Sequence, residues 1–232
     1  MQSLPEGYQA LVIGASGAIG SALVNQLKLD PRCGRVWGVG RNSQPSIDFN
    51  DESTVVQAAV EIRTQGPLNL VILAAGALHG AHGMPEKRLG QLNYTQMEAN
   101  FRINTMGPAL AMAHFAPLLD RHRRSLMGVL SAKVGSIGDN GLGGWYSYRA
   151  SKAALNMFLK TAAIEVSRTN PLAVLAALHP GTVDSALSAP FGGAEIGRPP
   201  AEAAAELLRV LDRLEPEHTG SFWAYDGQRL PW

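Results

Sequence analysis

The residues with the clearest chemical potential are Tyr148 and Lys152, which lie four positions apart in the segment Y-R-A-S-K. In a helix this spacing brings both side chains onto one face, one turn apart. A phenol normally titrates near pH ~10, and an ammonium group held beside it favours the phenolate and lowers that pKa. The pair can therefore act as a general acid and base. Alone, the same spacing also describes a pair on a solvated helix.

A glycine-rich segment, residues 14–20, lies between a short apolar run and a segment with helical spacing of Ile19, Leu23 and Leu27. Glycines let the backbone turn sharply and approach a pyrophosphate closely, and the N-terminus of a helix offers free N–H groups and a positive dipole. This context predicts a dinucleotide-binding turn rather than an ordinary glycine-rich one. The residues expected at the phosphates are Gly14, Ser16, Gly17, Ala18, Ile19 and Gly20.

The choice of cofactor depends on the residue that follows the second expected strand, residues 36–40. An acidic side chain there would bind the ribose 2′-hydroxyl of NAD. This chain has Arg41, whose guanidinium can hold the 2′-phosphate of NADP through charge-assisted hydrogen bonds. We therefore expect NADP(H) to be preferred, with NAD(H) as the alternative. Asp48 is expected near the adenine, although a turn explains it equally well.

The elements that position these residues alternate regularly along the chain. Short apolar runs predict strands at residues 10–13, 36–40, 68–75, 126–131, 172–178 and 221–225, with 46–49 as a weaker candidate. Helical spacing is found at residues 93–119, 148–167 and 201–214. Apolar strands separated by helices indicate a parallel sheet covered on both faces. We predict a single α/β domain over residues 1–232, a doubly wound Rossmann-type fold of about seven strands, with residues 186–200 as a short substrate-side loop.

The composition narrows the function further. The 232 residues are 46% hydrophobic and 17% charged, which suits a globular domain with a large core, and the net charge of +1 predicts no general attraction to nucleic acid or to an anionic membrane. A single cysteine, Cys33, fits a reducing compartment, and neither a signal peptide nor an apolar run of ~20 residues is evident. We expect a cytoplasmic protein. His79 and His82 lack a third ligand, so no metal is expected.

Taken in order, these motifs resemble those of the short-chain dehydrogenase/reductase superfamily, in its compact branch, over nearly the whole chain. The stretches S-A-K-V-G-S-I and G-G-W-Y-S-Y-R-A-S-K-A-A-L-N are most similar to the C-factor and sniffer-like carbonyl reductases. The matching features are the glycine-rich turn, a segment at the end of the expected strand 68–75, an Asn in the helix of residues 93–119, a Ser at the end of the expected strand 126–131, Y-x-x-x-K, and a P-G step. After the glycine-rich turn they are found here at residues 73–76, Asn104, Ser131, Tyr148 with Lys152, and Pro180 with Gly181.

The resemblance implies hydride transfer between NADP(H) and a small carbonyl or alcohol substrate, with Tyr148 as the general acid or base. Lys152 would lower the pKa of Tyr148 and bind the nicotinamide ribose, and Asn104 would fix a water molecule behind Lys152. It also implies a homodimer or homotetramer, because the middle helix and the 148–167 helix pair across subunits in many relatives. Further cofactor contacts are implied for Ala74, Ala75, Gly76, Pro180, Gly181, Val183 and Ser185.

Three departures from the family pattern leave alternatives open. The glycines of residues 14–20 are spaced as in the longer epimerase-like branch, and Leu73 and Ala74 replace the two Asn of the family segment. Ala132 occupies the position of the catalytic Ser, so the hydroxyl would come from Ser131 or from Ser136. The alternative function is a non-catalytic NAD(P)-binding regulator of the C-factor type. An epimerase or dehydratase is a third hypothesis.

Overall fold

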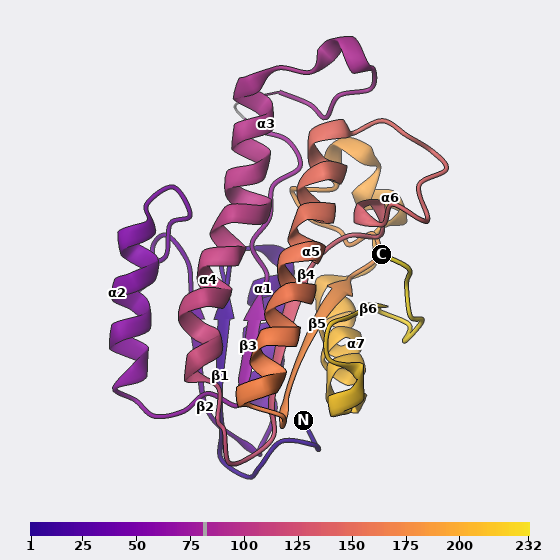
Figure 1. Cartoon of the computed structure of the whole chain (residues 1–232). Coiled ribbons are helices and arrows are strands. Elements are labelled where there is room, and N and C mark those ends of the chain that lie inside the picture. Colours follow the sequence, from indigo (N-terminus) through magenta and orange to yellow (C-terminus); the bar gives the residue numbers. More distant parts are fainter. Residues whose placement is uncertain (81–82) are drawn as a thin grey trace.

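The fold is that of a doubly wound α/β protein, as predicted from the sequence (Figure 1). The computed structural model describes residues 1–80 and 83–232, so the predicted loop residue His82 lies outside the described residues. One sheet has the strand order β2-β1-β3-β4-β5-β6, and all neighbouring strands are parallel. The strands are β1 (Tyr8–Ile13), β2 (Cys33–Val39), β3 (Leu70–Leu73), β4 (Ser125–Leu130), β5 (Ala173–His179) and β6 (Ser221–Ala224).

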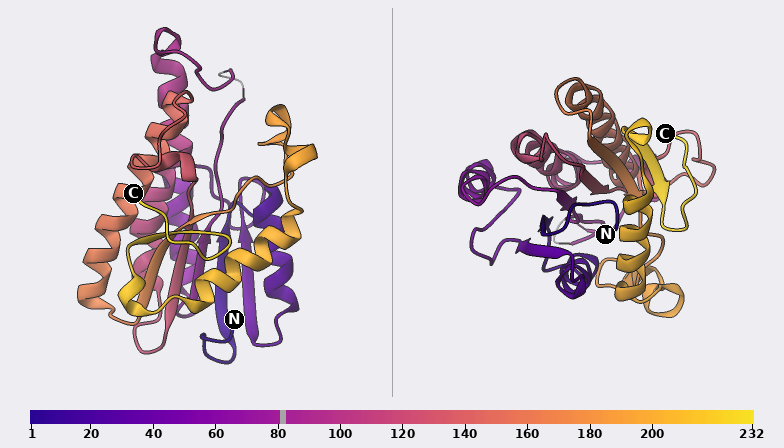
Figure 2. Two further views of the ribbon diagram at one scale, coloured as in Figure 1. Left: turned by 90° about the vertical axis from the view of Figure 1, so that its right-hand side faces the viewer. Right: turned by 90° about the horizontal axis from the view of Figure 1, so that it is seen from below.

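Helices cover both faces of this sheet (Figure 2). On one face lie α1 (Ala18–Leu29) and α7 (Pro200–Arg213), and their buried leucines pack against alternate residues of the central strands. The opposite face is covered by α2 (Glu52–Arg63), α4 (Gly107–Phe115) and α5 (Tyr146–Thr169). The strands β3 and β4 are buried along their whole length, which explains why they read as continuous apolar runs in the sequence.

Residues 46–49, the weaker strand candidate, do not join the sheet, which therefore has six strands rather than about seven. A parallel neighbour of β2 would need a crossover connection of about a dozen residues. Only residues 40–45 separate the end of β2 from this segment. Asp48 instead forms an isolated bridge with Asp51, and β2 remains the edge strand.

The helix α2 was not predicted from the sequence, although its pattern is that of an amphipathic helix. Asp51 caps its N-terminus by accepting a hydrogen bond from the backbone N–H of Ser53. Val55, Ala58 and Ile62 are buried at helical spacing against the sheet. The helix therefore closes the face of the sheet beside the segment that carries Asp48.

The middle helical segment is continuous but not uniform. After α3 (Tyr94–Phe101) comes a π-helical turn, Arg102–Met106, and then α4 begins at Gly107. π-Helical turns inside α-helices occur frequently at functional sites, because they widen the helix and redirect a side chain. Asn104 lies in this turn and is buried. The turn thus gives Asn104 a placement that a regular helix would not provide.

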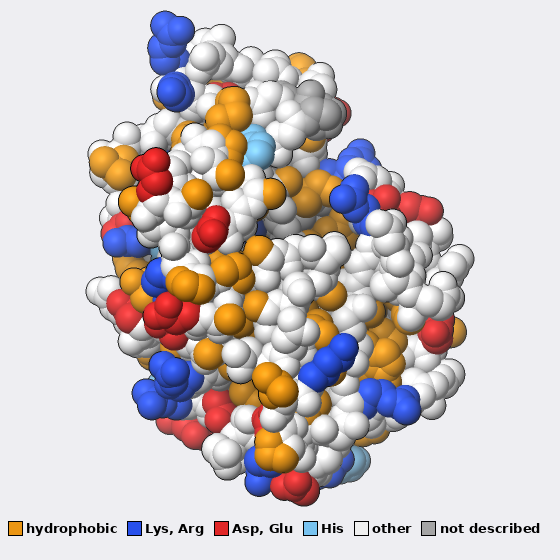
Figure 3. Space-filling view, turned by 180° about the vertical axis from the view of Figure 1, so that it is seen from behind, with side chains coloured by type: hydrophobic (Ala, Val, Ile, Leu, Met, Phe, Trp, Pro, Cys, Tyr) orange, Lys and Arg blue, Asp and Glu red, His pale blue; other side chains and the backbone are white. Residues whose placement is uncertain are grey.

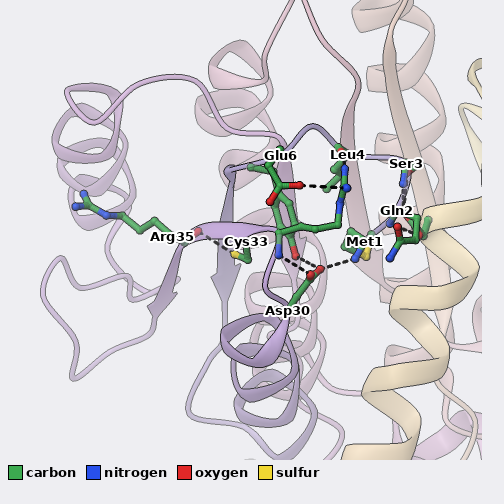
Figure 4. A network of polar contacts seen from close by, with 11 residues as sticks. Met1, Gln2, Ser3, Leu4, Glu6, Asp30, Cys33 and Arg35 are labelled. Atoms are coloured by element: carbon green, nitrogen blue, oxygen red, sulfur yellow. Dashed lines mark hydrogen bonds and ion pairs between the residues drawn. The ribbon is translucent and has the colours of Figure 1, made fainter.

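A polar network around Asp30 lies at the amino ends of the strands β1 and β2 (Figure 4). The Asp30 carboxylate accepts hydrogen bonds from the Tyr8 hydroxyl at 2.8 Å and from the backbone N–H of Arg32 at 2.9 Å, and it contacts the α-amino group of Met1. The Arg32 guanidinium forms an ion pair with Glu6. Because Asp30 follows α1 and Tyr8 begins β1, the network joins the first helix to the amino ends of the first two strands.

Surface charges of both signs are interspersed on the face shown in Figure 3. Among the residues that the structure describes, no helix is long and apolar enough to cross a lipid bilayer. The same residues contain no group of three or more His, Cys, Asp and Glu side chains that could hold a metal ion.

Candidate active site

The predicted site residues gather at the carboxyl edge of the sheet, around the point where β1 has β2 on one side and β3 on the other. Ligands of open α/β sheets bind at such a switch point. A cleft of about 420 Å³ lies there, which is within the range of small-molecule sites. It is lined by the predicted residues Gly14, Ser16, Gly17, Arg41, Asp48, Ala74, Ala75 and Gly76.

The geometry of the glycine turn explains each of its three glycines. Gly14 has a positive φ of 90°, and a Cβ atom there would lie 2.6 Å from the backbone nitrogen of Ala75. A Cβ on Gly20 would lie 2.1 Å from the carbonyl oxygen of Gly14, so Gly20 permits close packing of α1 against the turn. Gly17 differs, because the nearest atom to its Cβ position is 3.5 Å away. Gly14 and Gly20 are thus required by the fold, whereas Gly17 leaves open space at the start of α1.

The N-terminus of α1 has the properties of an anion site. Gly17 is its N-cap residue and makes no side-chain cap hydrogen bond, and the first turn carries no acidic residue. The first N–H groups of a helix lack partners within the helix and carry a positive dipole charge. These groups face the same turn whose glycines allow close approach, so the residues present fit a pyrophosphate.

Arg41 and Asp48 belong to the segment that follows β2, and they line the same cleft as the glycine turn. Arg41 is exposed directly after β2, where its guanidinium is accessible to a ligand. The Asp48 carboxylate accepts two hydrogen bonds from Asn50, at 3.0 Å from its backbone nitrogen and 2.9 Å from its side chain. Asp48 therefore stabilises a turn and lines the cleft at the same time. Sequence reasoning missed seven further lining residues, whose only signal was their nearness to predicted ones: Ile13, Gly40, Ile47, Phe49, Asn50, Ala77 and Ile103.

One face of α5 carries three polar side chains at helical spacing. Tyr148 is 8% exposed and Lys152 3% exposed, and the Lys152 ammonium lies 5.9 Å from the centre of the Tyr148 ring. Lys152 donates a hydrogen bond of 3.0 Å to the carbonyl oxygen of Leu130, at the end of β4. Asn156, one turn further along, accepts a hydrogen bond of 2.6 Å from the Ser131 hydroxyl. The end of β4 thus holds the inward face of α5.

Burial dominates the ionisation of the pair. It raises the pKa of Tyr148 to about 12 and lowers the pKa of Lys152 to about 8, because burial disfavours the phenolate and the ammonium alike. The sequence predicts a lowered phenol pKa, and burial instead shifts that pKa upward. As the pH rises, Lys152 therefore loses its proton before Tyr148 does. At neutral pH the phenol retains a proton that it can donate.

Asn104 is clamped to the loop that follows β3. Its side-chain oxygen accepts a hydrogen bond of 2.8 Å from the backbone N–H of Ala77, and its side-chain nitrogen donates one of 2.7 Å to the carbonyl of the same residue. Gly76 lies between Asn104 and Lys152, since a Cβ on Gly76 would be 3.4 Å from the Asn104 oxygen and 3.5 Å from the Lys152 nitrogen. Because Gly76 also lines the cleft, it connects the cleft to the Tyr148/Lys152 pair.

The two candidate serines differ in how their hydroxyls are used. The Ser131 hydroxyl donates to Asn156, which lies eight residues beyond Tyr148, or about 12 Å along a helix axis. The Ser136 hydroxyl accepts a hydrogen bond of 3.1 Å from the backbone N–H of Asp139. Ser136 is buried in the loop that follows β4. A role of either hydroxyl toward a substrate stays a prediction.

The segment after β5 is held in a fixed shape. Gly181 has a positive φ of 72°, and the Arg198 guanidinium stacks on the Tyr225 ring at 3.6 Å and contacts the carbonyl of Pro180. The Ser185 hydroxyl donates a hydrogen bond of 3.2 Å to the carbonyl of Val183. The predicted nicotinamide segment is thus ordered by contacts within the chain.

The substrate-side loop contains a short helix, α6 (Gly193–Ile196), and closes toward Tyr148. The ring of Phe191 lies 4.9 Å from that of Trp145, which in turn lies 6.2 Å from the ring of Tyr148. The His79 Nε2 atom lies 3.1 Å from the carbonyl oxygens of Ala186 and Leu187, which ties this loop to the one after β3. The phenol therefore has an aromatic wall on one side.

The fold and the site together define a dinucleotide-binding α/β protein with a buried tyrosine–lysine pair beside its cleft. The profile of the short chain dehydrogenase family matches residues 41–195. The 1-hydroxy-2-glutathionyl-2-methyl-3-butene dehydrogenase of Rhodococcus sp. (strain AD45) is 33% identical over 193 residues, which cover 83% of this chain and 81% of the relative. The chain belongs to the short chain dehydrogenase family, and it is an NAD(P)-dependent oxidoreductase of that family.

Further similar proteins are consistent with membership of this family. The C-signal protein of Myxococcus xanthus is 35% identical over 144 residues, which cover 62% of this chain and 83% of the relative. The carbonyl reductase Sniffer of D. melanogaster has a similar fold, with a TM-score of 0.84 and 20% identity over 97% of this chain and 99% of that one. An NADPH-bound carbonyl reductase from chicken fatty liver also has a TM-score of 0.84, with 22% identity over 98% of this chain and 95% of that one.

The space around Gly17 generates a first prediction. The variant Gly17→Ala should fold normally, because its Cβ meets no atom closer than 3.5 Å. Its methyl group would fill the space in which we expect a phosphate to bind. We expect the Kd for NADPH to rise about tenfold or more, as measured by fluorescence titration. The matched control is Gly90→Ala, an exposed glycine with open space around its Cβ position. Unchanged NADPH affinity in Gly17→Ala would contradict the placement of the phosphates.

Proposed function

We propose that this protein is an NADP(H)-dependent oxidoreductase that interconverts small carbonyl compounds and alcohols, with Tyr148 as the general acid or base. The observation that supports it best is the buried Tyr148/Lys152 pair, which Gly76 joins to a cleft at the switch point of the sheet. The reaction adds hydride to the carbonyl carbon, and the nicotinamide supplies that hydride when it is bound. The chain itself supplies the proton and the binding sites.

In reduction, the Tyr148 hydroxyl donates its proton to the carbonyl oxygen of the substrate as negative charge develops there. The phenolate that remains is stabilised by the Lys152 ammonium, which lies near the Tyr148 ring. Asn104, held against Ala77 near Lys152, is proposed to fix a water molecule through which a proton returns. In oxidation the same groups act in reverse.

The proposed preference for NADP(H) rests on Arg41. Its side chain is exposed at the rim of the cleft, and no acidic residue follows β2 at the position that would bind the ribose of NAD. Guanidinium groups bind phosphate through paired, charge-assisted hydrogen bonds. The similar fold of a carbonyl reductase that was solved with NADPH is consistent with this choice. The proposal places Asp48 and Phe49 near the adenine and residues 180–185 near the nicotinamide.

Ser136 is better suited than Ser131 to hold the substrate oxygen. Within residues 1–80 and 83–232 the Ser136 hydroxyl accepts one hydrogen bond and its own hydrogen has no acceptor. The Ser131 hydrogen is already donated to Asn156. A hydroxyl that donates to the developing oxyanion would stabilise the transition state. We therefore propose Ser136 for this role, with Ser131 as the alternative.

The second candidate function is a regulator that binds NAD(P) without turnover. Its support is the similarity to the C-signal protein, together with Ala132 at the position where the family has its catalytic Ser. The buried and complete set of Tyr148, Lys152 and Asn104 favours the enzyme. We also propose that the protein is a homodimer or homotetramer, as the family resemblance implies.

The proposed chemistry is tested by the variant Tyr148→Phe, which removes only the hydroxyl. We expect the wild-type protein to consume NADPH with at least one member of a panel of aldehydes, ketones and quinones, followed as loss of absorbance. In Tyr148→Phe the value of kcat should fall by about 10²–10⁴-fold, because general acid catalysis is lost. NADPH binding should stay unchanged.

The same assay on Ser131→Ala and Ser136→Ala serves to compare the two hydroxyls, and Ser136→Ala should be the slower. Tight NADPH binding by the wild type without turnover of any panel compound would favour the regulator. Equal rates for Tyr148→Phe and the wild type would exclude Tyr148 as the proton donor.

The cofactor preference is tested by Arg41→Ala. Loss of a charged hydrogen-bond donor should weaken NADPH binding by about tenfold or more. NADH lacks the 2′-phosphate, so its binding should not change. The measurement is the ratio of the two Kd values in the wild type and the variant. The control is Arg35→Ala, because Arg35 lies on β2 and its guanidinium bonds to Gln65. An unchanged ratio in Arg41→Ala would show that Arg41 does not select the cofactor.

A further inference from the structure

Glu86 is a buried carboxylate in the segment between β3 and α3. It is 2% exposed, and no ion pair to it is found in the part of the chain that the structure describes. Its carboxylate accepts a hydrogen bond of 3.1 Å from the backbone N–H of Ser147 and another from the Ser147 hydroxyl. Its backbone carbonyl accepts a hydrogen bond from the N–H of Trp145. Because a buried carboxylate is costly without hydrogen bonds, these contacts are what accommodate Glu86.

These contacts replace a cap that α5 itself lacks. The N-cap residue Trp145 has no side chain that can accept from the helix, and the first turn of α5 carries no acidic residue. The first N–H groups of a helix need acceptors from elsewhere, and a negative charge there is favourable. Glu86 supplies the acceptor and the carboxylate from a segment 61 residues away in sequence.

The chain enters α5 through an unusual backbone. Gly143, Gly144 and Trp145 are successive residues with positive φ values of 65°, 66° and 52°. Trp145 is the only non-glycine residue with a positive φ among the described residues. Such a conformation persists only where neighbouring groups hold it. The backbone carbonyl of Glu86 accepts from the N–H of Trp145, and the Arg149 side chain donates to the carbonyls of Gly143 and Gly144 at 3.2 and 2.9 Å.

Both residues that Glu86 holds adjoin the proposed proton donor. Ser147 directly precedes Tyr148 in the chain, and the Trp145 ring packs edge-on against the Tyr148 ring. A shift of the first turn of α5 would therefore move the phenol and the aromatic wall together. The cleft at β1 and β3 is lined by other segments, so such a shift leaves the proposed phosphate and adenine end of the dinucleotide site in place.

We propose that Glu86 is a positioning residue: its carboxylate fixes Ser147 at the start of α5, next to the Trp145 N–H that its backbone carbonyl holds, and so places the Tyr148 hydroxyl against the substrate carbonyl. The inference rests on the proposed function, because it concerns the rate of the reaction that Tyr148 serves. It predicts that loss of Glu86 affects kcat much more than the affinity for NADPH. If Glu86 only supported the fold, its loss would lower the stability of the protein and leave kcat of the folded protein unchanged.

The test compares Glu86→Ala and Glu86→Gln with the wild type. Glu86→Ala should lower kcat by about ten- to a hundredfold, since displacement of a catalytic group by about 1 Å has an effect of that size. The Kd for NADPH should be unchanged. Glu86→Gln should recover most of the rate, because its amide oxygen can still accept from Ser147. Should Glu86→Ala not fold, Ser147→Ala, which removes only the hydroxyl donor, should lower kcat in the same direction.

The matched control is Asp120→Ala. Asp120 is 3% exposed and accepts hydrogen bonds from the backbone N–H groups of His122 and Arg123, but it precedes β4 at the other end of the sheet. This control should lower the urea midpoint of unfolding and keep the wild-type kcat. A wild-type kcat in Glu86→Ala, or a loss of kcat in Asp120→Ala as large as that in Glu86→Ala, would overturn the proposal.

A second readout separates this inference from the proposed function. Hydrogen exchange in the peptide that spans Trp145 and Ser147 should be faster in Glu86→Ala than in the wild type or in Asp120→Ala, whatever the substrate. If the wild type reduces no carbonyl compound, the proposed function is contradicted. Faster exchange in Glu86→Ala would still support the role of Glu86 at the start of α5. Unchanged exchange would overturn the role of Glu86 even if Tyr148 proves to be catalytic.

Discussion

Desolvation acts in opposite directions on the two ionisable groups that α5 buries at the carboxyl edge of the sheet. It keeps the phenol of Tyr148 protonated, with a pKa of about 12, and it makes Lys152 easier to deprotonate, with a pKa of about 8. The pair therefore holds a proton on the phenol over the whole neutral range. The charge on Lys152 is what can stabilise the phenolate once that proton has been given away.

The rest of the site can be understood as support for these two groups. The carbonyl of Leu130 fixes the Lys152 ammonium, and Gly76 leaves room between Lys152 and Asn104. A parallel sheet makes this convergence possible, because the carboxyl ends of β1, β3, β4 and β5 lie along the same edge. Segments that are far apart in the sequence thus meet at one end of the molecule. The glycine turn at α1 adds an anion site at that same edge.

The sequence was sufficient for features that local patterns encode. The apolar runs and the helical spacing predicted the doubly wound fold, and the context of Gly14, Gly17 and Gly20 predicted the turn at the switch point. The strand at residues 46–49 was wrong because the short connection from β2 leaves no room for a crossover. The pKa direction of Tyr148 could not be foreseen, since it depends on burial that only the packed structure defines. The contact of Glu86 with Ser147 joins segments 61 residues apart, and no short-range pattern signals it.

The account is tested most directly by the pH dependence of carbonyl reduction. The rate measured with NADPH and carbonyl substrate both well below their KM values reports the ionisations of the protein before either one binds. It should be highest where Lys152 is charged and fall as the pH rises through about 8, because the ammonium that stabilises the phenolate is lost. In Lys152→Met the rate should be low and this inflection should be absent. A wild-type profile that stays level through pH 8, or the same inflection in Lys152→Met, would contradict the role assigned to the pair.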